Sequence, residues 1–278
     1  MQPERERALL GYMESLEPSV KSLWRDRLAA FGPRRLGLAV LDQLYPPVCL
    51  RCEAPTAQSD GLCAACFAQL RPISAPLCPQ LGIPFEFFMG ADALSAEALA
   101  DPPPFTRARA AVVYNEVART LVSRLKYGDR PELAKFCARM MAGAGHELWA
   151  GSPPVLVPVP LHRKRQRERR YNQSAELALQ LSRLTGVAAD LSLVSRIKPT
   201  RQQVGLSSTG RLRNVQGAFA VHPDLPIRLK GRRVVLVDDV YTTGATTKAV
   251  SRVLLRAGVE QVDVITFARV VVGEEEPI

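Results

Sequence analysis

Two adjacent carboxylates are followed by a run of hydroxyl side chains in the last fifth of the chain. Asp238 and Asp239 come directly after the aliphatic run 234–237, and the segment 242–247 reads Thr-Thr-Gly-Ala-Thr-Thr. Carboxylates accept hydrogen bonds from vicinal hydroxyls or face a hydrated Mg²⁺. Free N–H groups at a helix start, together with Thr hydroxyls, bind phosphate, and Gly244 lets the backbone come close to it. The pattern therefore predicts a site for a sugar phosphate.

Two other interpretations of the acid pair have to be weighed. Aliphatic residues followed by Asp-Asp also resemble a Walker B strand, but such proteins need a Gly-Lys pair in their phosphate-binding loop, and this chain contains none. The second alternative is a core strand that ends in a solvated acid pair and an ordinary turn. The number of positions that agree favours the sugar-phosphate site over both.

A second phosphate-type segment follows the strand-like residues 155–159. Between residues 163 and 170 the only acid is Glu168, and the cationic residues are Arg163, Lys164, Arg165, Arg167, Arg169 and Arg170. The forked donors of Arg match phosphate oxygens, so pyrophosphate is a natural ligand. A basic surface helix or a nucleic-acid patch is the alternative, and the two roles do not exclude each other.

The polar, basic segment 195–219 has no clear periodicity. Long segments of this kind in compact domains are usually functional, which favours a mobile loop that closes over a substrate. A surface loop without function is the alternative. Its candidate ligand contacts are Arg201, Gln203, Arg211 and Arg213.

Two Cys-x-x-Cys pairs lie near the N-terminal end, at Cys49, Cys52, Cys63 and Cys66. Four thiolates at this spacing predict a tetrahedral Zn²⁺ site, and four protein ligands leave no open position, so the zinc would be structural. Cys78 begins a similar pattern, but Leu81 stands where a second thiol would be. Any second ribbon has therefore lost its metal.

Disulfides are the alternative for these thiols, and they require an oxidising compartment. The N-terminal residues are charged, and the apolar run 36–41 is shorter than a signal peptide core or a membrane span. We expect a cytoplasmic protein with reduced cysteines and no membrane span.

The elements that must position these residues alternate between strands and helices. Strand patterns cover 110–114, 155–159, 234–237 and 262–272, and helix patterns cover 116–125, 131–144, 174–184 and 249–258. Such alternation is typical of a parallel sheet. Ligands of such sheets bind beyond the carboxyl ends of the strands, where the acid pair and the cationic segment both stand.

The segment 235–246 resembles the phosphoribosyl pyrophosphate (PRPP) signature of type I phosphoribosyltransferases: Val-Leu-Val-Asp-Asp-Val-Tyr-Thr-Thr-Gly-Ala-Thr. The resemblance implies that the two acids hold the ribose, the Thr/Gly loop the 5′-phosphate and the cationic segment the pyrophosphate. The implied catalytic residues are Asp238, Asp239, Arg163, Lys164 and Arg165. The implied PRPP-binding residues are Val240, Tyr241, Thr242, Thr243, Gly244, Ala245, Thr246, Thr247, Pro160, Arg201 and Arg213.

From about residue 36 onward the chain resembles the ComF competence family. The cysteine pairs, the Leu-Lys-Tyr run at 125–127, Val-Pro-Val-Pro-Leu-His-Arg-Lys-Arg at 157–165 and Arg-Leu-Arg-Asn-Val-Gln-Gly-Ala-Phe at 211–219 carry this resemblance. The chain departs from the family at 169–173, where Arg-Arg-Tyr-Asn-Gln replaces the usual Arg-Gly-Phe-Asn-Gln, and at Leu81, where the family has a second cysteine.

The expected fold is therefore α/β: a parallel-sheet type I phosphoribosyltransferase domain preceded by a small Cys₄ zinc-ribbon module. The predicted boundaries are 1–43 for an N-terminal helical extension, 44–85 for the zinc ribbon, 86–105 for a linker and 106–278 for the phosphoribosyltransferase domain.

The expected activity is the Mg²⁺-assisted displacement of pyrophosphate from C1 of PRPP by an unidentified nitrogenous acceptor, linked to DNA uptake. A non-catalytic PRPP- or nucleic-acid-binding accessory protein of DNA uptake is the main alternative, and a nucleotide-salvage enzyme is a third.

The chain has 37 basic and 27 acidic residues, so anionic partners are expected, either phosphorylated metabolites or single-stranded DNA. DNA-uptake proteins are further expected partners. Aromatic residues are sparse in the basic segments, so no base-stacking platform is evident.

Overall fold

A computed structural model describes residues 46–57, 60–127, 131–162, 171–198, 217–223 and 229–271 of the chain. The chain divides into two compact units, one of residues 1–47 and 55–59, the other of residues 48–54 and 60–278. All the helices and strands given below belong to the second unit. None of the helices in the described ranges is long and apolar enough to cross a membrane.

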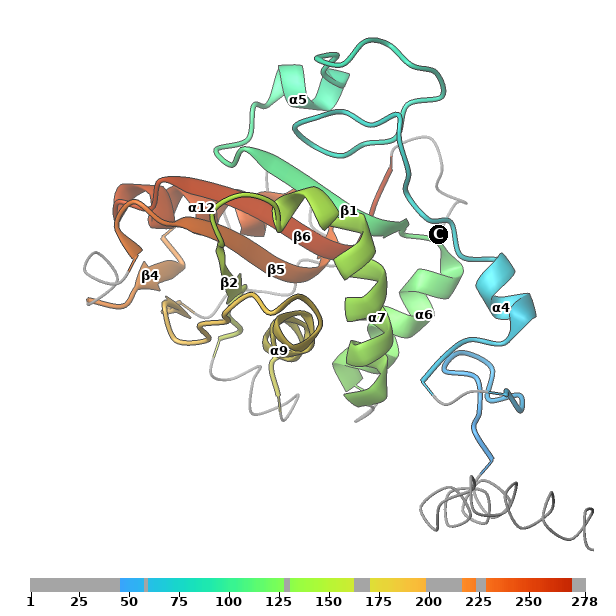
Figure 1. Cartoon of the computed structure of the whole chain (residues 1–278). Helices are drawn as coiled ribbons and strands as arrows, with labels where there is room; N and C mark the ends of the chain where they lie inside the picture. The colour runs from blue at the N-terminus through green and yellow to red at the C-terminus, as the bar shows by residue number, and fades with distance from the viewer. Residues whose placement is uncertain are drawn as a thin grey trace, which may run out of the picture. The chain divides into compact units, whose positions relative to one another are not determined.

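A four-stranded parallel sheet forms the centre of this unit, in the order β1-β6-β5-β2 (Figure 1). The strands are β1 (Arg107–Val113), β6 (Gln261–Arg269), β5 (Arg233–Tyr241) and β2 (Val155–Pro158). Nearly every residue of β1 and β6 is buried, as expected for strands that are covered on both faces. The predicted parallel α/β architecture is confirmed, and β5 extends through the acid pair to Tyr241.

Helices cover both faces of the sheet. On one face lie α6 (Glu116–Tyr127), α7 (Pro131–Ala144) and α9 (Gln173–Thr185), which share a core with Val235 and Val237 of β5. On the other face α12 (Ala245–Arg256) packs with Val234 and Leu236. Successive residues of a strand point to opposite faces, which is why a continuous valine run serves two cores.

The segment that we predicted as a loop is ordered at both ends. Strand β3 (Val194–Arg196) pairs antiparallel with β4 (Phe219–Val221), and Arg196 lies opposite Phe219. The prediction of an irregular segment over all of 195–219 is wrong at these ends. A two-stranded stem places the start and end of the segment side by side, and residues 199–216 lie outside the described ranges.

The N-terminal part of the second unit packs against α6. Leu50 and Leu70, before and after the short helix α4 (Ala64–Ala68), belong to the same apolar core as α6. The guanidinium of Arg51 pairs with Glu116 at 2.9 Å, and that of Arg124 donates to the Leu50 carbonyl at 3.0 Å. A second short helix, α5 (Ala96–Ala100), and the 3₁₀ turn η1 (His146–Leu148) complete the described helices. The boundaries of the predicted domains stay a prediction.

Candidate functional site

Asp238 stands near the carboxyl end of β5 and is held by two donors. The Ser174 hydroxyl donates to Asp238 Oδ1 at 2.9 Å, and the Asp239 N–H donates to the same oxygen at 2.9 Å. Ser174 lies in the first turn of α9, whose N-cap is Asn172. Asn172 also donates to the Val159 carbonyl at 3.2 Å, just beyond β2. The start of α9 is thus tied both to the end of β2 and to the acid pair.

Asp239 is only 5% exposed and is neutralised by a lysine from another element. The Lys126 Nζ, in the last turn of α6, lies 2.8 Å from Asp239 Oδ2. The other carboxylate oxygen accepts the Val240 N–H at 2.8 Å. This buried charge is therefore paired and hydrogen-bonded, as a stable buried carboxylate requires.

The pKa of Asp238 is raised to about 7. Burial is the largest cause, and the charge of Asp239 adds to it, whereas the Ser174 hydroxyl, the Asp239 N–H and Lys126 act in the opposite direction. Near neutral pH Asp238 therefore exists in both protonation states. A carboxyl group balanced in this way is common at functional sites.

The loop between β5 and α12 turns at Gly244. This residue has φ +71° and is the N-cap of α12, and a Cβ there would overlap the Tyr241 hydroxyl. Because glycine has no side chain, no side-chain acceptor caps the N–H groups at the start of α12. The Thr243 hydroxyl is buried and has no hydrogen-bond partner among the described residues. A helix start without an N-cap side chain and a buried hydroxyl are suited to an anion.

Strand β2 brings a further predicted residue to the same edge. Pro158 lies opposite Val237 in the parallel ladder, and the Val159 N–H donates to the Val237 carbonyl at 2.9 Å. Pro160 therefore leaves the sheet at the level of the acid pair. The structure brings together Pro160 and residues 238–247, whereas Arg163, Lys164, Arg165, Arg201 and Arg213 lie outside the described residues. Arg167, Arg169, Arg170, Gln203 and Arg211 lie outside them too.

Three residues of this site had no predicted role. Ser174 and Lys126 contact the acid pair from far away in sequence, and Asn172 contacts the end of β2. For Lys126 the available signal was its place in the Leu-Lys-Tyr run at 125–127, which indicates a family but no contact. Nothing in the local pattern around Ser174 distinguishes it from an ordinary first-turn serine, because its importance comes from the packing of α9 beside β5.

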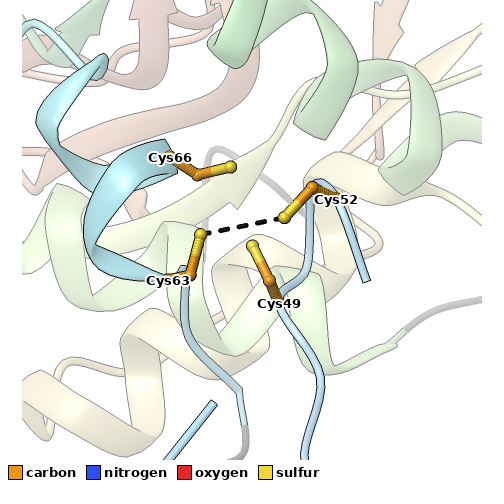
Figure 2. Close-up of side chains that lie close together, drawn as sticks. All are labelled: Cys49, Cys52, Cys63 and Cys66. Carbon is orange, nitrogen blue, oxygen red and sulfur yellow. Dashed lines mark hydrogen bonds between the residues drawn. The ribbon is translucent and has the colours of Figure 1, made fainter. Parts of the chain in front are cut away.

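The four cysteines of the N-terminal pairs converge on one point (Figure 2). Their sulfur atoms all lie within 4.8 Å of one another, and the Sγ atoms of Cys52 and Cys63 are 3.7 Å apart. Cys66 lies on α4, which begins directly after Cys63, and Cys49 accepts the Arg51 N–H at 3.4 Å. The two pairs thus come from a turn and from a helix start.

This arrangement fits a structural Zn²⁺ ion. Zn–S bonds of about 2.3 Å in a tetrahedron separate neighbouring sulfurs by about 3.8 Å, close to the Cys52–Cys63 distance. A disulfide would need a bond of about 2 Å, and all four thiols are free. The donor set is four soft thiolates without a carboxylate or an imidazole, which favours zinc over magnesium or calcium.

Two domain families match this chain. The double zinc ribbon domain matches residues 40–98, and the phosphoribosyl transferase domain matches residues 173–278. With the sheet and the cysteine cluster described above, these matches confirm the predicted fold: a parallel-sheet phosphoribosyltransferase domain preceded by a Cys₄ zinc ribbon.

Several characterised proteins are similar over nearly their whole length. DNA utilization protein YhgH of Salmonella typhi is 34% identical over 230 residues, which cover 81% of this chain and 97% of that protein. Competence protein F of Haemophilus influenzae is 31% identical over 231 residues, which cover 80% and 96%. A solved structure of the allosteric regulatory enzyme of purine biosynthesis is 21% identical and covers 51% of this chain and 29% of its own, with a TM-score of 0.34. A similarity that distant carries no functional conclusion.

Proposed function

Since this chain belongs to the ComF family, we propose that its phosphoribosyltransferase domain binds PRPP with Mg²⁺ and displaces pyrophosphate at C1 of the ribose. The observation that carries the proposal is the meeting of three element ends at one edge of the sheet: the acid pair of β5, the first turn of α9 and the uncapped start of α12. A protein that used this fold only as a scaffold would have no need for a buried acid pair beside an uncapped helix start.

Each part of PRPP has a complementary group in the proposed complex. Asp238 and Asp239 accept hydrogen bonds from the ribose hydroxyls. The N–H groups of residues 245–247 and the hydroxyls of Thr242, Thr243 and Thr246 bind the 5′-phosphate, whereas the buried Thr247 hydroxyl donates to the Gly244 carbonyl at 3.0 Å and supports the turn. Arg163, Lys164 and Arg165 come shortly after Pro160 and bind the pyrophosphate. Further contacts come from the segment between β3 and β4, through Arg201 and Arg213.

In the proposed reaction the C1–O bond to pyrophosphate breaks and the oxygen keeps the electron pair. The lone pair of an acceptor nitrogen forms the new C1–N bond, and a proton on that nitrogen, where there is one, passes to solvent. The protein positions the ribose and stabilises the charge that builds up on the leaving group. No nucleophilic side chain takes part. The acceptor is proposed only by class, as a nitrogenous compound.

The two carboxylates fit a magnesium ion that arrives with its ligand. Mg²⁺ prefers six oxygen ligands and keeps several waters, so two carboxylates, one of them paired with Lys126, are too few to hold it alone. PRPP oxygens would complete the shell. When bound, the ion would supply neutralising charge to the pyrophosphate.

Calorimetric titration of PRPP in the presence of Mg²⁺ tests this proposal. We expect micromolar binding to the wild type and its loss in Asp238→Ala/Asp239→Ala. The matched control is Asp190→Ala, which removes a carboxylate that caps Ser192 on an exposed turn outside the site and should leave the affinity unchanged. Absence of heat with PRPP, ribose 5-phosphate and pyrophosphate alike would refute the phosphoribosyl site.

A second candidate function is that of an accessory protein of DNA uptake that binds PRPP or nucleic acid without turnover. The net charge of +10 and the names of the relatives, which refer to DNA utilization and competence, favour it. Release of pyrophosphate from PRPP in the presence of candidate acceptors distinguishes the two functions, because an accessory protein would bind PRPP and release none. A cytoplasmic location belongs to both proposals.

A further inference from the structure

The backbone around Cys78 repeats the backbone around Cys49. The Cys49 N–H donates to Ala54 O, five residues on, and the Cys78 N–H donates to Ile83 O, also five residues on, both at 2.8 Å. The Cys49 carbonyl accepts from Glu53, and the Cys78 carbonyl accepts from Gly82, four residues on in each case. Glu53 and Gly82 share a left-handed conformation, with φ +63° and +64°.

The second half of each repeat also agrees. Helix α4 begins after Cys63, whose φ and ψ are −65° and 160°, and α5 begins after Ser95, with −69° and 154°. Both helices are five residues long, and Cys66 and Ala98 each occupy the third position. Residues 76–100 are therefore a second copy of the ribbon, continuing past the boundary at residue 85 that the sequence predicts.

By this correspondence, the four ligand positions of the second copy are Cys78, Leu81, Ser95 and Ala98. These side chains converge as the cysteines do, because Cys78 Sγ accepts the N–H groups of Leu81 and Ser95, both at 3.4 Å. Cys78, Leu81 and Ala98 are at most 1% exposed and share one apolar cluster. The Ser95 hydroxyl accepts the Ala98 N–H at 3.4 Å, and a neutral hydroxyl is not among the usual zinc ligands.

These residues do not fit a metal ion. Leu81 and Ala98 have no donor atom, and the Leu81 side chain is fully buried in the same apolar cluster as Cys78. Among the described residues, the cysteines of the first copy are the one group of three or more His, Cys, Asp or Glu side chains close enough to hold an ion. The match to a double zinc ribbon and the donor set of the second copy therefore disagree.

The phosphoribosyltransferase domain binds the turn of the second copy at three consecutive carbonyls. Arg109 donates to Pro79 O at 3.0 Å, the Ala108 N–H donates to Gln80 O at 2.8 Å, and Arg269 donates to Leu81 O. Gly82 lies flush against β1, since a Cβ there would overlap the Ala108 carbonyl. The guanidinium of Arg269 also covers the Tyr241 ring at 4.9 Å, next to the turn at Gly244.

We propose that residues 76–100 are a metal-free second zinc ribbon, in which an apolar interior and three hydrogen bonds from the phosphoribosyltransferase domain replace the ion. The chain accordingly binds one Zn²⁺, through Cys49, Cys52, Cys63 and Cys66. The copy that lies beside the phosphate-type loop keeps its shape when zinc is removed.

Zinc content per chain, measured by mass spectrometry on the full-length protein purified under reducing conditions, tests this inference. We expect one zinc in the wild type, one in Cys78→Ser and none in Cys49→Ser/Cys52→Ser. Leu81→Cys/Ser95→Cys/Ala98→Cys should raise the content from one to two, and adding Cys78→Ser to these three changes should lower it. Cobalt titration should show two tetrathiolate sites in the triple variant and one in the wild type.

Two zinc ions in the wild type, or loss of zinc in Cys78→Ser, would overturn the metal-free assignment. A folded triple variant that binds a single zinc would overturn the correspondence of the four positions. If the triple variant fails to fold, the zinc content of Cys78→Ser decides alone. None of these measurements involves PRPP, so their results test the metal-free assignment independently of the proposed function.

Discussion

At the scale of single residues, the Ser174 hydroxyl favours the ionised form of Asp238. A hydroxyl that donates to a carboxylate favours its ionised form, and here it opposes the burial that raises the pKa to about 7. An ionised carboxylate accepts hydrogen bonds from two ribose hydroxyls better than a protonated carboxyl group does. The pH at which Asp238 ionises should therefore set the pH above which PRPP binds tightly.

Ser174→Ala should move this pH dependence upward. Without the hydroxyl the pKa of Asp238 rises further, so PRPP affinity at pH 7 should fall by about threefold to tenfold, since one pKa unit corresponds to a factor of ten. The loss of affinity should shrink toward pH 9, where the Asp238 carboxyl is ionised in both the wild type and the variant. Calorimetry between pH 6 and 9 measures it, with Ser182→Ala on the same helix as the control. Parallel profiles would show that Ser174 acts only on packing.

The free energy of unfolding, measured by denaturant titration at a series of pH values, should fall between about pH 4 and pH 7. The folded-state pKa of Asp238 is raised above its ordinary value of 3.8. The neutral form therefore contributes stability that is complete below about pH 4 and is lost as the pH rises through about 7. In Ser174→Ala that loss should extend to higher pH.

At the scale of elements, the sequence predicted most of what lies within one segment. The helix over 131–144 and the strand cores 155–159 and 234–237 were predicted because local periodicity decides them. The pairing of β3 with β4 was missed, since both strands are three residues long and depend on each other. The acid pair and its loop were predicted from type and spacing, whereas Lys126 and Ser174 were not, because α6 and α9 bring them there through tertiary packing.

The junction of β5 and α12 gives a test at this scale. Gly244→Ala introduces a Cβ at φ +71° that overlaps the Tyr241 hydroxyl. A non-glycine residue in such a conformation costs about 1–3 kcal/mol, and the loop must shift. PRPP affinity should therefore fall about tenfold, which corresponds to a loss of about 1.4 kcal/mol of binding free energy. Titration calorimetry and thermal unfolding measure the two effects.

Gly143→Ala is the matched control for this change. Gly143 is an exposed residue of α7, and a Cβ there would meet no atom within 4 Å. Alanine favours helix over glycine by up to about 1 kcal/mol, so this variant should be slightly more stable and bind PRPP unchanged. An equal loss of PRPP binding in both variants would contradict the special role of the Gly244 turn.

At the scale of the whole molecule, the net charge of the chain is opposite in sign to the charge of the acid pair. The chain carries a net charge of +10, yet the side chains proposed to hold the ribose are acidic. A strongly cationic protein attracts any polyanion, and the attraction weakens with salt because counterions are released. Ligand recognition at the acid pair and polyanion binding by the basic surface should therefore be separable.

Single-stranded DNA binding measured by fluorescence anisotropy between 50 and 300 mM salt tests this separation. We expect an affinity that falls steeply and log-linearly with salt, because each phosphate contact releases counterions. Asp238→Ala/Asp239→Ala should bind DNA as tightly as the wild type or more tightly, since it removes negative charge, while PRPP binding is lost. Arg165→Glu/Arg169→Glu should lower the affinity for both PRPP and DNA, because the cationic segment is proposed to bind both. DNA binding that disappears with the acid pair would instead place both ligands in one pocket, and nucleic acid would then be a competitor of PRPP.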